Sequence, residues 1–379
     1  MQEVYINKIT KFLPNSPISN DEMESYLGEI DGKPSKAKRL VLRSNKIKTR
    51  YYAINKKGIA THTNSQLVAE SIKLLFNKPG DIKDIEMLTA GTSSPDQFMP
   101  SHAVMVHGEL PEMNSIEVMT ASGNCCSGIQ GLKYAFLNIA TGQINNAVCA
   151  GSERLSRNMR AEQFEPEIEA KKTLEKNEYI AFEKDFLRWM LSDGAASALL
   201  SNKKNEDSLS FKIDWIEGVS YANKVETCMY MAAIKNEKGE LVSFKEYTPN
   251  QIQEDSILSI KQDVKLLSEN ILKFGMDKLQ QVLEKHKIHI SRFDYFLPHL
   301  SSYFFEEKIY KLLKENNLEI PKEKWFTNLA KVGNVGAASP LLMLEEIMHN
   351  GQLKKGDKLL IMVPESARFS YIYMSLTVC

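Results

Sequence analysis

The sequence predicts an α/β protein built from two related halves. Strand-like and amphipathic helical runs alternate along the whole chain, which is typical of α/β folds. The chain has 379 residues, whereas one hydrophobic core seldom serves more than about 250 residues. The order helix, turn, strand also occurs once in each half. We therefore expect two similar lobes, residues 1–203 and 204–379, with a boundary in the polar stretch 201–208.

The first half contains the first of these helix, turn and strand units. Ser19 and Glu22 have the spacing of a capping box, so a helix start is expected there. Apolar residues then recur at three-to-four spacing through residues 65–76, which predicts a helix. After a Pro-Gly turn, the apolar run 85–90 is typical of a buried strand.

The second half repeats this order. Helical periodicity extends over residues 267–283, and a strand is expected at 295–297. Residues 147–151 and 359–363 also correspond, since both are buried-strand runs that follow a helix opened by small residues. The similarity lies in pattern and not in residue identity, so it indicates related lobes rather than a repeated sequence.

Composition and charge exclude several classes of protein. The chain carries 48 basic and 48 acidic side chains, and this zero net charge disfavours nucleic-acid binding by long-range attraction. No stretch reaches the roughly 18 apolar residues of a membrane span, and residues 1–14 lack the hydrophobic block of a signal peptide. The five cysteines are odd in number and lack metal-type spacing. We therefore expect a cytoplasmic protein with reduced thiols and no metal site.

Residues 155–190 have the composition of an insertion. They are rich in charged side chains with aromatic residues between them. We interpret this segment as a helical cap over a pocket, as part of a dimer contact, or as plain surface packing. The sequence leaves all three interpretations open.

Two adjacent cysteines lie where a helix is expected to begin. The apolar spacing of residues 129–139 defines one helical face and places Cys125 and Cys126 at or just before the helix N-terminus. Free N–H groups and the dipole at that end stabilise a thiolate and can hold an oxyanion. The common alternative is a buried cysteine that packs as a small hydrophobic side chain.

Two polar residues of the second half occupy positions of a kind that often bind ligands. His299 follows the predicted strand 295–297, at its C-terminal end. Asn334 lies in a glycine-containing turn just before a predicted helix. Taken singly, a structural imidazole and a turn asparagine are the ordinary explanations of such residues.

Four motifs, taken together, point to a known family. In chain order they are Cys125-Cys126-Ser127-Gly128, Ser192-Asp193-Gly194-Ala195-Ala196-Ser197-Ala198, Leu297-Pro298-His299 and Gly333-Asn334-Val335-Gly336-Ala337-Ala338-Ser339. At these motifs the chain resembles the ketoacyl-ACP synthase III branch of the thiolase superfamily. The motifs occur in the family's order and are spread over nearly the whole chain.

The resemblance implies a thiolase-like five-layered αβαβα fold from two similar lobes, normally a homodimer. It implies an acyltransferase in which Cys126 carries an acyl chain as a thioester, because Ser-Gly must follow the family nucleophile directly. His299 and Asn334 then hold the thioester carbonyl of a second, carrier-bound substrate with two hydrogen-bond donors. Loss of carbon dioxide from a malonyl-type unit forms an enolate, which attacks the acyl cysteine in a Claisen condensation.

The same resemblance implies the partners and separates close relatives. Acyl-CoA or acyl-ACP thioesters are the substrates, acyl carrier protein is the partner, and no cofactor is expected. A thiolase is disfavoured because the stretch 363–369 lacks the second cysteine that such an enzyme uses as a base. A hydroxymethylglutaryl-CoA synthase is disfavoured because Ser93 stands where that enzyme has a glutamate.

Departures from the fatty-acid initiation enzyme bear on the substrate. The stretch 42–50 lacks the tryptophan that clamps coenzyme A in that enzyme, and Ser44 falls at its arginine position. Residues 365–368 replace its C-terminal glycine triplet. Glu153 follows a predicted strand end and is a candidate auxiliary base, although a solvated or salt-bridged glutamate is common. Similar departures occur in ketosynthases that make dialkylresorcinol and flexirubin-type precursors, which join two acyl units and close a cyclohexanedione ring.

Two further regions are expected from the resemblance to contact substrates or partners. Phe98 and Met99 match a segment that crosses the dimer and closes the partner's acyl tunnel, although core packing explains Met99 nearly as well. Five basic residues are candidates for contacts with an acidic acyl carrier protein, the alternative being a solvated charged face. They are Lys46, Lys48, Arg50, Lys308 and Lys311.

Three functions therefore follow in order of preference. The first is a ketosynthase of specialised lipid or polyketide biosynthesis that joins an acyl group on Cys126 to a carrier-bound malonyl or β-ketoacyl-type unit. The second is a fatty-acid initiation enzyme that condenses acetyl-CoA with malonyl-ACP. The third is a non-catalytic ketosynthase-like partner subunit, which the presence of Cys126, His299 and Asn334 disfavours.

Overall fold

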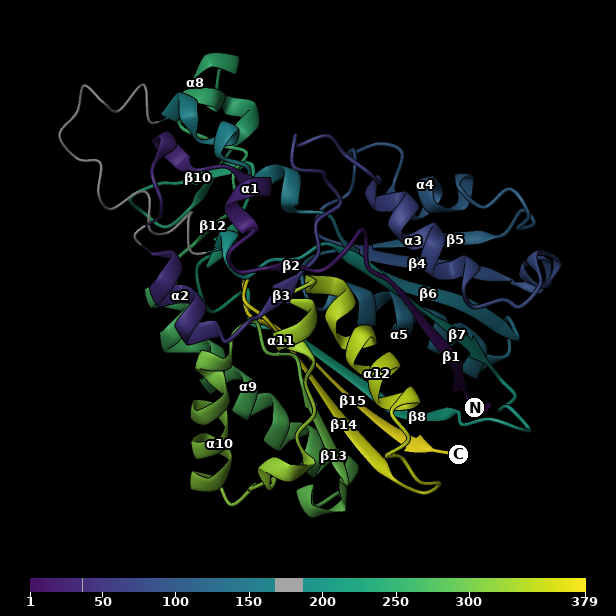
Figure 1. Ribbon diagram of the computed structural model, residues 1–379. Helices are drawn as coiled ribbons and strands as arrows, with labels where there is room; N and C mark the ends of the chain where they lie inside the picture. Colours follow the sequence, from purple (N-terminus) through teal and green to yellow (C-terminus); the bar gives the residue numbers. More distant parts are fainter. Residues whose placement is uncertain (36, 168–186) are drawn as a thin grey trace.

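One large mixed sheet runs through the molecule (Figure 1). The computed structural model describes residues 1–35, 37–167 and 187–379. Within these residues the sheet has nine strands in the order β13-β14-β15-β8-β1-β7-β6-β4-β5. The strands are β1 (Tyr5–Phe12), β4 (Met87–Thr92), β5 (Glu117–Ser122), β6 (Asn146–Glu153), β7 (Gly194–Ser201), β8 (Phe211–Ser220), β13 (Tyr295–Pro298), β14 (Lys358–Glu365) and β15 (Ser370–Val378).

Helices and short hairpins surround this sheet. The helices are α1 (Met23–Leu27), α2 (Lys38–Asn45), α3 (Asn64–Lys73), α4 (His102–Gly108), α5 (Ser127–Thr141), α8 (Pro249–Glu254), α9 (Val264–His286), α10 (Glu306–Glu315), α11 (Leu329–Val332) and α12 (Ser339–His349). The short paired strands are β2 (Ile18–Ser19) with β3 (Thr49–Arg50), β9 (Met229–Tyr230) with β12 (Lys261–Gln262), and β10 (Ala233–Lys235) with β11 (Leu241–Ser243).

The strand pairing repeats between the two ends of the sheet. In the first half, β4 is parallel to β6, which is antiparallel to β7, which is antiparallel to β1. In the second half, β13, β14, β15 and β8 are paired in the same sequence of directions. The parallel pairing of β5 with β4 has a reduced counterpart, a single parallel bridge between Phe296 and Trp325. The predicted lobe boundary at residue 203 lies in the connection between β7 and β8 and stays a prediction.

The molecule has five layers, and hydrophobic clusters pack between them. Two of the layers are the half-sheets, which are the strands β5, β4, β6, β7 and β1 of the first half and the strands β8, β15, β14 and β13 of the second. Helices α5 and α12 share one cluster with residues of both half-sheets, such as Cys149 on β6 and Ile361 on β14. Helices α3 and α4 cover the outer face of the first half-sheet, and α9 and α10 cover that of the second. The central layer is tight, because a Cβ on Gly128 or Gly151 would come within 2.3 Å of the carbonyl oxygen of Ala337. Only glycine allows this approach of backbone to backbone.

The elements expected from periodicity are present. The helices predicted at 65–76 and 267–283 are α3 and α9. The predicted strands at 85–90 and 295–297 are β4 and β13, which confirms these predictions within a few residues at each end.

The predicted capping box at Ser19 is wrong. Ser19 belongs to β2, and α1 begins only at Met23 without a side-chain cap. The Glu22 carboxylate instead accepts hydrogen bonds from the Ser19 amide at 3.1 Å and from its hydroxyl at 2.7 Å. The two residues therefore close a turn between a strand and a helix of only five residues.

Residues 168–186, which form much of the predicted insertion 155–190, lie outside the described residues.

Among the helices that are described, none is both long enough and apolar enough to span a bilayer.

Candidate active site

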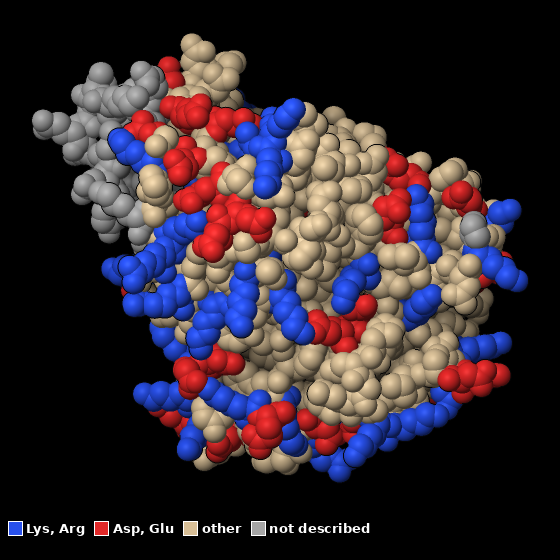
Figure 2. Space-filling model, in the orientation of Figure 1, with Lys and Arg blue, Asp and Glu red and all other residues tan. Residues whose placement is uncertain are grey.

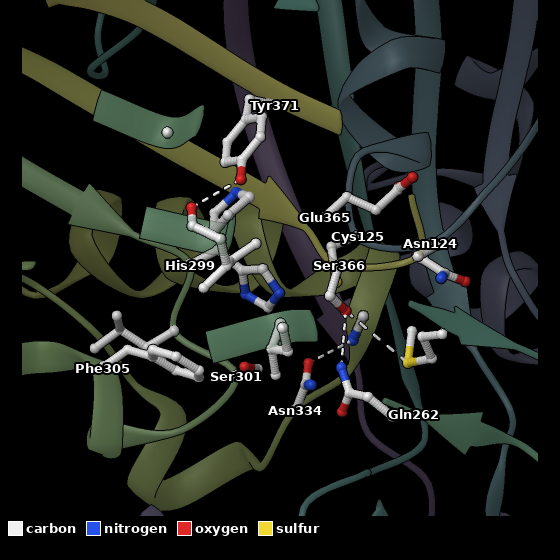
Figure 3. A pocket seen from close by; sticks show the side chains of 18 of the residues that line it. Asn124, Cys125, Gln262, His299, Ser301, Phe305, Asn334, Glu365, Ser366 and Tyr371 are labelled. Atoms are coloured by element: carbon white, nitrogen blue, oxygen red, sulfur yellow. Dashed lines mark hydrogen bonds between the residues drawn. The ribbon is translucent and has the colours of Figure 1, made fainter. Parts of the chain in front are cut away.

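An apolar cavity of about 390 Å³ lies where β14 and β15 of the second half-sheet face α9 and α10 (Figure 3). This volume is within the range of about 300–1,000 Å³ that is usual for small-molecule sites. Polar residues from both halves of the chain line this cavity, among them Ser93, Cys125, Glu153, His299, Asn334, Glu365 and Ser366. The apolar part is built largely from leucine, isoleucine and methionine side chains. Three predicted site residues, Glu153, His299 and Asn334, therefore share one cavity.

Cys126 lies at the N-cap position of α5 and is fully buried, with 0% of its surface exposed. Its thiol donates a hydrogen bond to the carbonyl oxygen of Val363 at 3.3 Å, and its amide donates one to Oε2 of Glu365 at 3.0 Å. Burial raises the pKa of this thiol well above its ordinary value, and the Glu365 carboxylate raises it further. The resting site therefore holds a neutral thiol.

Cys125, and not Cys126, is among the residues that line the cavity. Burial raises the pKa of the Cys125 thiol too, with further contributions from Glu365 and Glu153. The nucleophile role of Cys126 stays a prediction. It requires the Cys126 thiol to turn from Val363 toward the cavity when a substrate binds.

His299 follows β13 directly, and its backbone amide donates to the carbonyl of Met362 on β14 at 2.8 Å. The side chain is only 3% exposed, and burial lowers its pKa to about 4. The ring is therefore neutral near pH 7. Its Nε2 has no hydrogen-bond partner among the described residues, so it is available to a ligand in the cavity.

Asn334 is held in a fixed orientation at the start of the turn before α12. Its backbone amide donates to Met190, and its carbonyl accepts from Ser192 at 2.9 Å. Its side-chain Oδ1 accepts from the amide of Gly336 at 3.0 Å, as the dashed line in Figure 3 marks. Because Oδ1 already accepts this hydrogen bond, the side-chain NH2 group is the part of Asn334 that can donate to a ligand.

Ser192 and Asp193 hold the chain next to this turn through hydrogen bonds. The buried carboxylate of Asp193 accepts hydrogen bonds from the amides of Ala53 at 2.7 Å, Leu155 at 2.7 Å and Ser156 at 3.0 Å. The Ser192 hydroxyl accepts from the amide of Tyr51 at 2.9 Å. These residues thus tie the chain entering β7 to the loop after β6, and the Ser192 amide holds the backbone carbonyl of Asn334.

Glu153 ends β6 and is fully buried, with both carboxylate oxygens engaged. Oε1 accepts from the amides of Ser93 at 3.1 Å and Ala337 at 3.3 Å. Oε2 accepts from the hydroxyls of Ser93 at 2.7 Å and Ser94 at 2.6 Å, with Thr92 more distant at 3.5 Å. Burial raises the pKa of Glu153 to about 7, and these hydrogen bonds oppose the shift. Its predicted auxiliary role in catalysis stays a prediction.

The raised pKa of Glu153 predicts a pH dependence of stability. The folded protein holds this proton up to about pH 7, whereas the unfolded chain releases it near pH 4.5. The contribution is therefore fully present below pH 4.5 and is lost as the pH rises to about 7, by about 3 kcal/mol. Urea unfolding at pH 5 and pH 8 should show a smaller loss for Glu153→Gln than for the wild type. Equal losses in the two proteins would contradict the assignment.

Glu365 begins the divergent stretch 365–368, to which the sequence motifs assign no role. It ends β14, as His299 follows β13, and the ends of these parallel neighbours meet at one edge of the sheet. Burial raises the pKa of its carboxyl group, and the amides of Cys126 and Asn124 oppose the shift. Figure 3 shows Glu365 beside Cys125 and Asn124, so a second carboxylate borders the two cysteines.

The predicted tunnel and carrier residues lie outside the cavity lining. Phe98 and Met99 are 79% and 86% exposed, which excludes core packing in the protomer. The four lysines, Lys46, Lys48, Lys308 and Lys311, are exposed. The prediction that Arg50 contacts the carrier protein is wrong, because this side chain is fully buried. Its guanidinium donates a hydrogen bond to Asn20 at 2.7 Å and contacts Met23. Arg50 ends β3, where the pairing with β2 turns its side chain into the core.

The chain is similar to several known proteins. Residues 283–363, which include His299 and Asn334, match the family 3-Oxoacyl-[acyl-carrier-protein (ACP)] synthase III C terminal. A Beta-ketoacyl-[acyl-carrier-protein] synthase III of Clostridium botulinum (strain Okra / Type B1) is 24% identical over 367 residues, covering 95% of this chain and 94% of the relative. The protein of the same description from Clostridium perfringens (strain ATCC 13124) is 24% identical over 351 residues, covering 92% of each chain.

Solved structures share the fold. AbyA1, a tetronic acid condensing enzyme, superimposes with a TM-score of 0.74 at 16% identity and covers 99% of each chain. A single-residue variant of OleA from Xanthomonas campestris gives a TM-score of 0.73 at 17% identity, covering 99% of this chain and 98% of that one. FabH of Pseudomonas aeruginosa PAO1 gives 0.71 at 16% identity, with the same coverage. The chain is therefore similar over nearly its whole length to proteins described as Beta-ketoacyl-[acyl-carrier-protein] synthase III, and it has the thiolase-like fold of these solved condensing enzymes.

Proposed function

We propose that this ketosynthase loads an acyl chain longer than acetyl onto Cys126 and joins it to a carrier-bound malonyl or β-ketoacyl-type unit. The observation that carries this proposal is the apolar cavity that adjoins the cysteines, His299 and Asn334. In this proposal the two donors hold the enolate oxygen of the second substrate, and the acyl chain occupies the cavity. No cofactor takes part, since acyl-CoA or acyl-ACP supplies both carbon units.

The shape of the lining supports a chain of several carbons. The α9 side chains Leu267, Ile271, Leu272, Met276 and Leu279 face the cavity from one side. The α10 side chains Ile309, Leu312 and Leu313 add further apolar surface. Burying each methylene of an acyl chain against such surface contributes about 0.8 kcal/mol, which favours longer donors over acetyl. Fatty-acid initiation with acetyl-CoA is the second candidate, supported by the description of the curated relatives.

The two buried carboxylates support a specialised product. A decarboxylating condensation forms its enolate without a protein base, yet this site contains both Glu153 and Glu365. An extra base among these carboxylates suits a reaction with further proton transfers, such as closure of a cyclohexanedione ring in dialkylresorcinol-type biosynthesis. The third candidate, a non-catalytic partner subunit, offers no reason for a neutral imidazole whose Nε2 has no partner among the described residues.

An acyl carrier protein is the proposed partner, docking on the basic face around α2. Figure 2 shows Lys and Arg side chains gathered over this part of the molecule. Lys46, at the end of α2, lies 5.7 Å from the ring of Tyr303, and Lys308 lies 3.8 Å from the neighbouring ring of Phe304. These contacts bring basic residues from distant parts of the chain onto one surface. Lys311 is the weaker candidate, because it pairs with Glu315 at 3.7 Å.

The same proposal includes a homodimer in which the edge strand β5 lies at the centre of the interface between the two subunits. β5 forms the edge of the described sheet, and exposed edge strands are prone to pair with another chain. Exposed apolar side chains occur in the neighbouring segments: Phe98, Met99, Val104, Tyr134 and Leu137. A dimer through this edge would cover them. The five cysteines are free thiols, which agrees with a cytoplasmic location in this proposal.

The experiment that tests the proposal is acylation by a panel of thioester donors, followed by intact-protein mass spectrometry. We expect medium or long acyl donors to modify the wild type faster than acetyl-CoA does. Leu272→Trp, which fills the cavity from α9, should slow long donors about 10- to 100-fold relative to acetyl. Leu74→Trp is the matched control, because Leu74 is exposed at the end of α3 and outside the cavity. Modification by acetyl-CoA alone would favour fatty-acid initiation, and no modification by any donor would favour the non-catalytic subunit.

A further inference from the structure

The two buried carboxylates of the site differ in how they are held. Glu153 accepts hydrogen bonds on both oxygens, from Ser93, Ser94 and Ala337 among others. Its lone pairs are therefore directed at fixed partners, which suits a structural anchor. Glu365 accepts from two backbone amides, those of Cys126 and Asn124, and among the described residues no side chain is recorded as a donor to it. Of the two, Glu365 has the greater capacity to act on a ligand.

The position of Glu365 is next to the bond that the reaction must form. The new carbon–carbon bond joins the acyl carbon on the Cys126 sulfur to the α-carbon of the second substrate. That α-carbon must therefore approach Cys126 closely, and Oε2 of Glu365 lies 3.0 Å from the backbone nitrogen of the same residue. Glu365 also lines the cavity that contains His299 and Asn334. A carboxylate at this place can reach a proton on the incoming α-carbon.

We propose that Glu365 is the base that removes the α-proton of a second substrate of the β-ketoacyl thioester class. The C–H bond of the methylene between the two carbonyls breaks, its proton passes to Glu365, and its electron pair forms the enolate held by His299 and Asn334. The enolate carbon attacks the acyl carbon, the bond from that carbon to the Cys126 sulfur breaks, and the thiolate takes the proton from Glu365. No carbon dioxide is lost, and the neutral thiol and the Glu365 carboxylate are restored.

The acylation step itself prepares Glu365 for this role. The amide of Cys126, at the N-terminus of α5, is the donor that an acyl carbonyl on the sulfur needs. The carbonyl must displace the carboxylate from that amide. Burial already raises the pKa of Glu365, and the loss of the hydrogen bond from Cys126 raises it further. The carboxylate thus becomes a stronger base only after the first substrate is in place.

This inference rests on the proposed function and narrows its second substrate. A malonyl unit produces its enolate by losing carbon dioxide and has no need of Glu365. A β-ketoacyl thioester keeps its α-carbon protonated until a base acts. The presence of the Glu365 carboxylate beside the Cys126 amide therefore favours a substrate that must be deprotonated.

The test compares two second substrates on one acylated enzyme. Wild type and Glu365→Gln are loaded with the same acyl donor and then given either a malonyl or a β-ketoacyl carrier-protein thioester, and products are quantified by mass spectrometry. We expect Glu365→Gln to lower the rate with the β-ketoacyl thioester about 100-fold more than the rate with the malonyl thioester. Glu365→Asp should recover part of the β-ketoacyl rate. Glu269→Gln, a glutamate on the exposed face of α9, is the matched control and should change neither rate.

The outcomes separate this inference from the proposed function. A wild type that condenses neither second substrate contradicts the proposed function and removes the inference with it. A wild type that condenses both, with equal losses for the two substrates in Glu365→Gln, contradicts only the role of Glu365 as a base. Equal rates in Glu365→Gln and wild type contradict that role as well.

Discussion

We expect the Cys126→Ala variant to form no detectable acyl-enzyme with any thioester donor. The reason is chemical, because alanine offers no sulfur to attack the thioester, and removal of a nucleophile commonly costs a factor of about 10³ or more. Intact-protein mass spectrometry measures the effect directly as the absence of the acyl mass. The amide of residue 126 and the Glu365 carboxylate remain, so the site keeps its hydrogen bond.

Cys125→Ala is the matched control for this experiment. Cys125 lies next to Cys126 and lines the cavity, but it does not precede the Ser-Gly pair. We expect this variant to keep acylation within about tenfold of the wild type, since a buried cysteine to alanine change removes little more than one packed atom. The opposite result, with acylation lost in Cys125→Ala and kept in Cys126→Ala, would make Cys125 the nucleophile.

The second large effect is expected at the two donors. His299→Ala and Asn334→Ala should each slow condensation about 10²- to 10³-fold, the usual loss when one donor to a developing oxyanion is removed. Acylation of Cys126 should still proceed in both variants, because the donors act on the second substrate. Single-turnover measurements that follow the acyl-enzyme mass and the product separately distinguish the two steps.

Asn334→Asp is the sharpest control at this position. It keeps the shape of the side chain and the acceptor for Gly336, but it replaces the NH2 donor by an acceptor oxygen. We expect condensation in Asn334→Asp to fall at least as far as in Asn334→Ala. Condensation by Asn334→Asp at the wild-type rate would show that Asn334 serves the turn rather than the substrate.

Hydrophobic periodicity predicted those helices and strands that bury a face of their own. The periodicity of α9 and the apolar run of β13 are visible in a single sequence, because each element buries a face of its own. The burial of Arg50 was not predictable in this way. Its surroundings are set by the pairing of two-residue strands and by Asn20, which is 30 residues away.

Some residues of the candidate site are likewise visible in the local sequence, whereas others depend on contacts between distant segments. Motif spacing found His299 and Asn334, because both follow recognisable local signals, a strand end and a glycine turn. The contact of Glu365 with the Cys126 amide joins residues 239 apart in the chain, and no local pattern reports it. The fit of five donors around Glu153 likewise depends on how three separate segments meet.

The shared central layer bears on how the chain folds during synthesis. Helix α12 comes from the end of the sequence, yet it packs in one cluster with β1 and β7 of the first half-sheet. When the ribosome has made only the first 203 residues, α5 is present in this layer, but the apolar surface that α12 covers is still exposed. Apolar surface that stays exposed during synthesis favours aggregation or chaperone binding until α12 has been made. The two halves repeat the same strand plan, yet their shared core is complete only when both have been made.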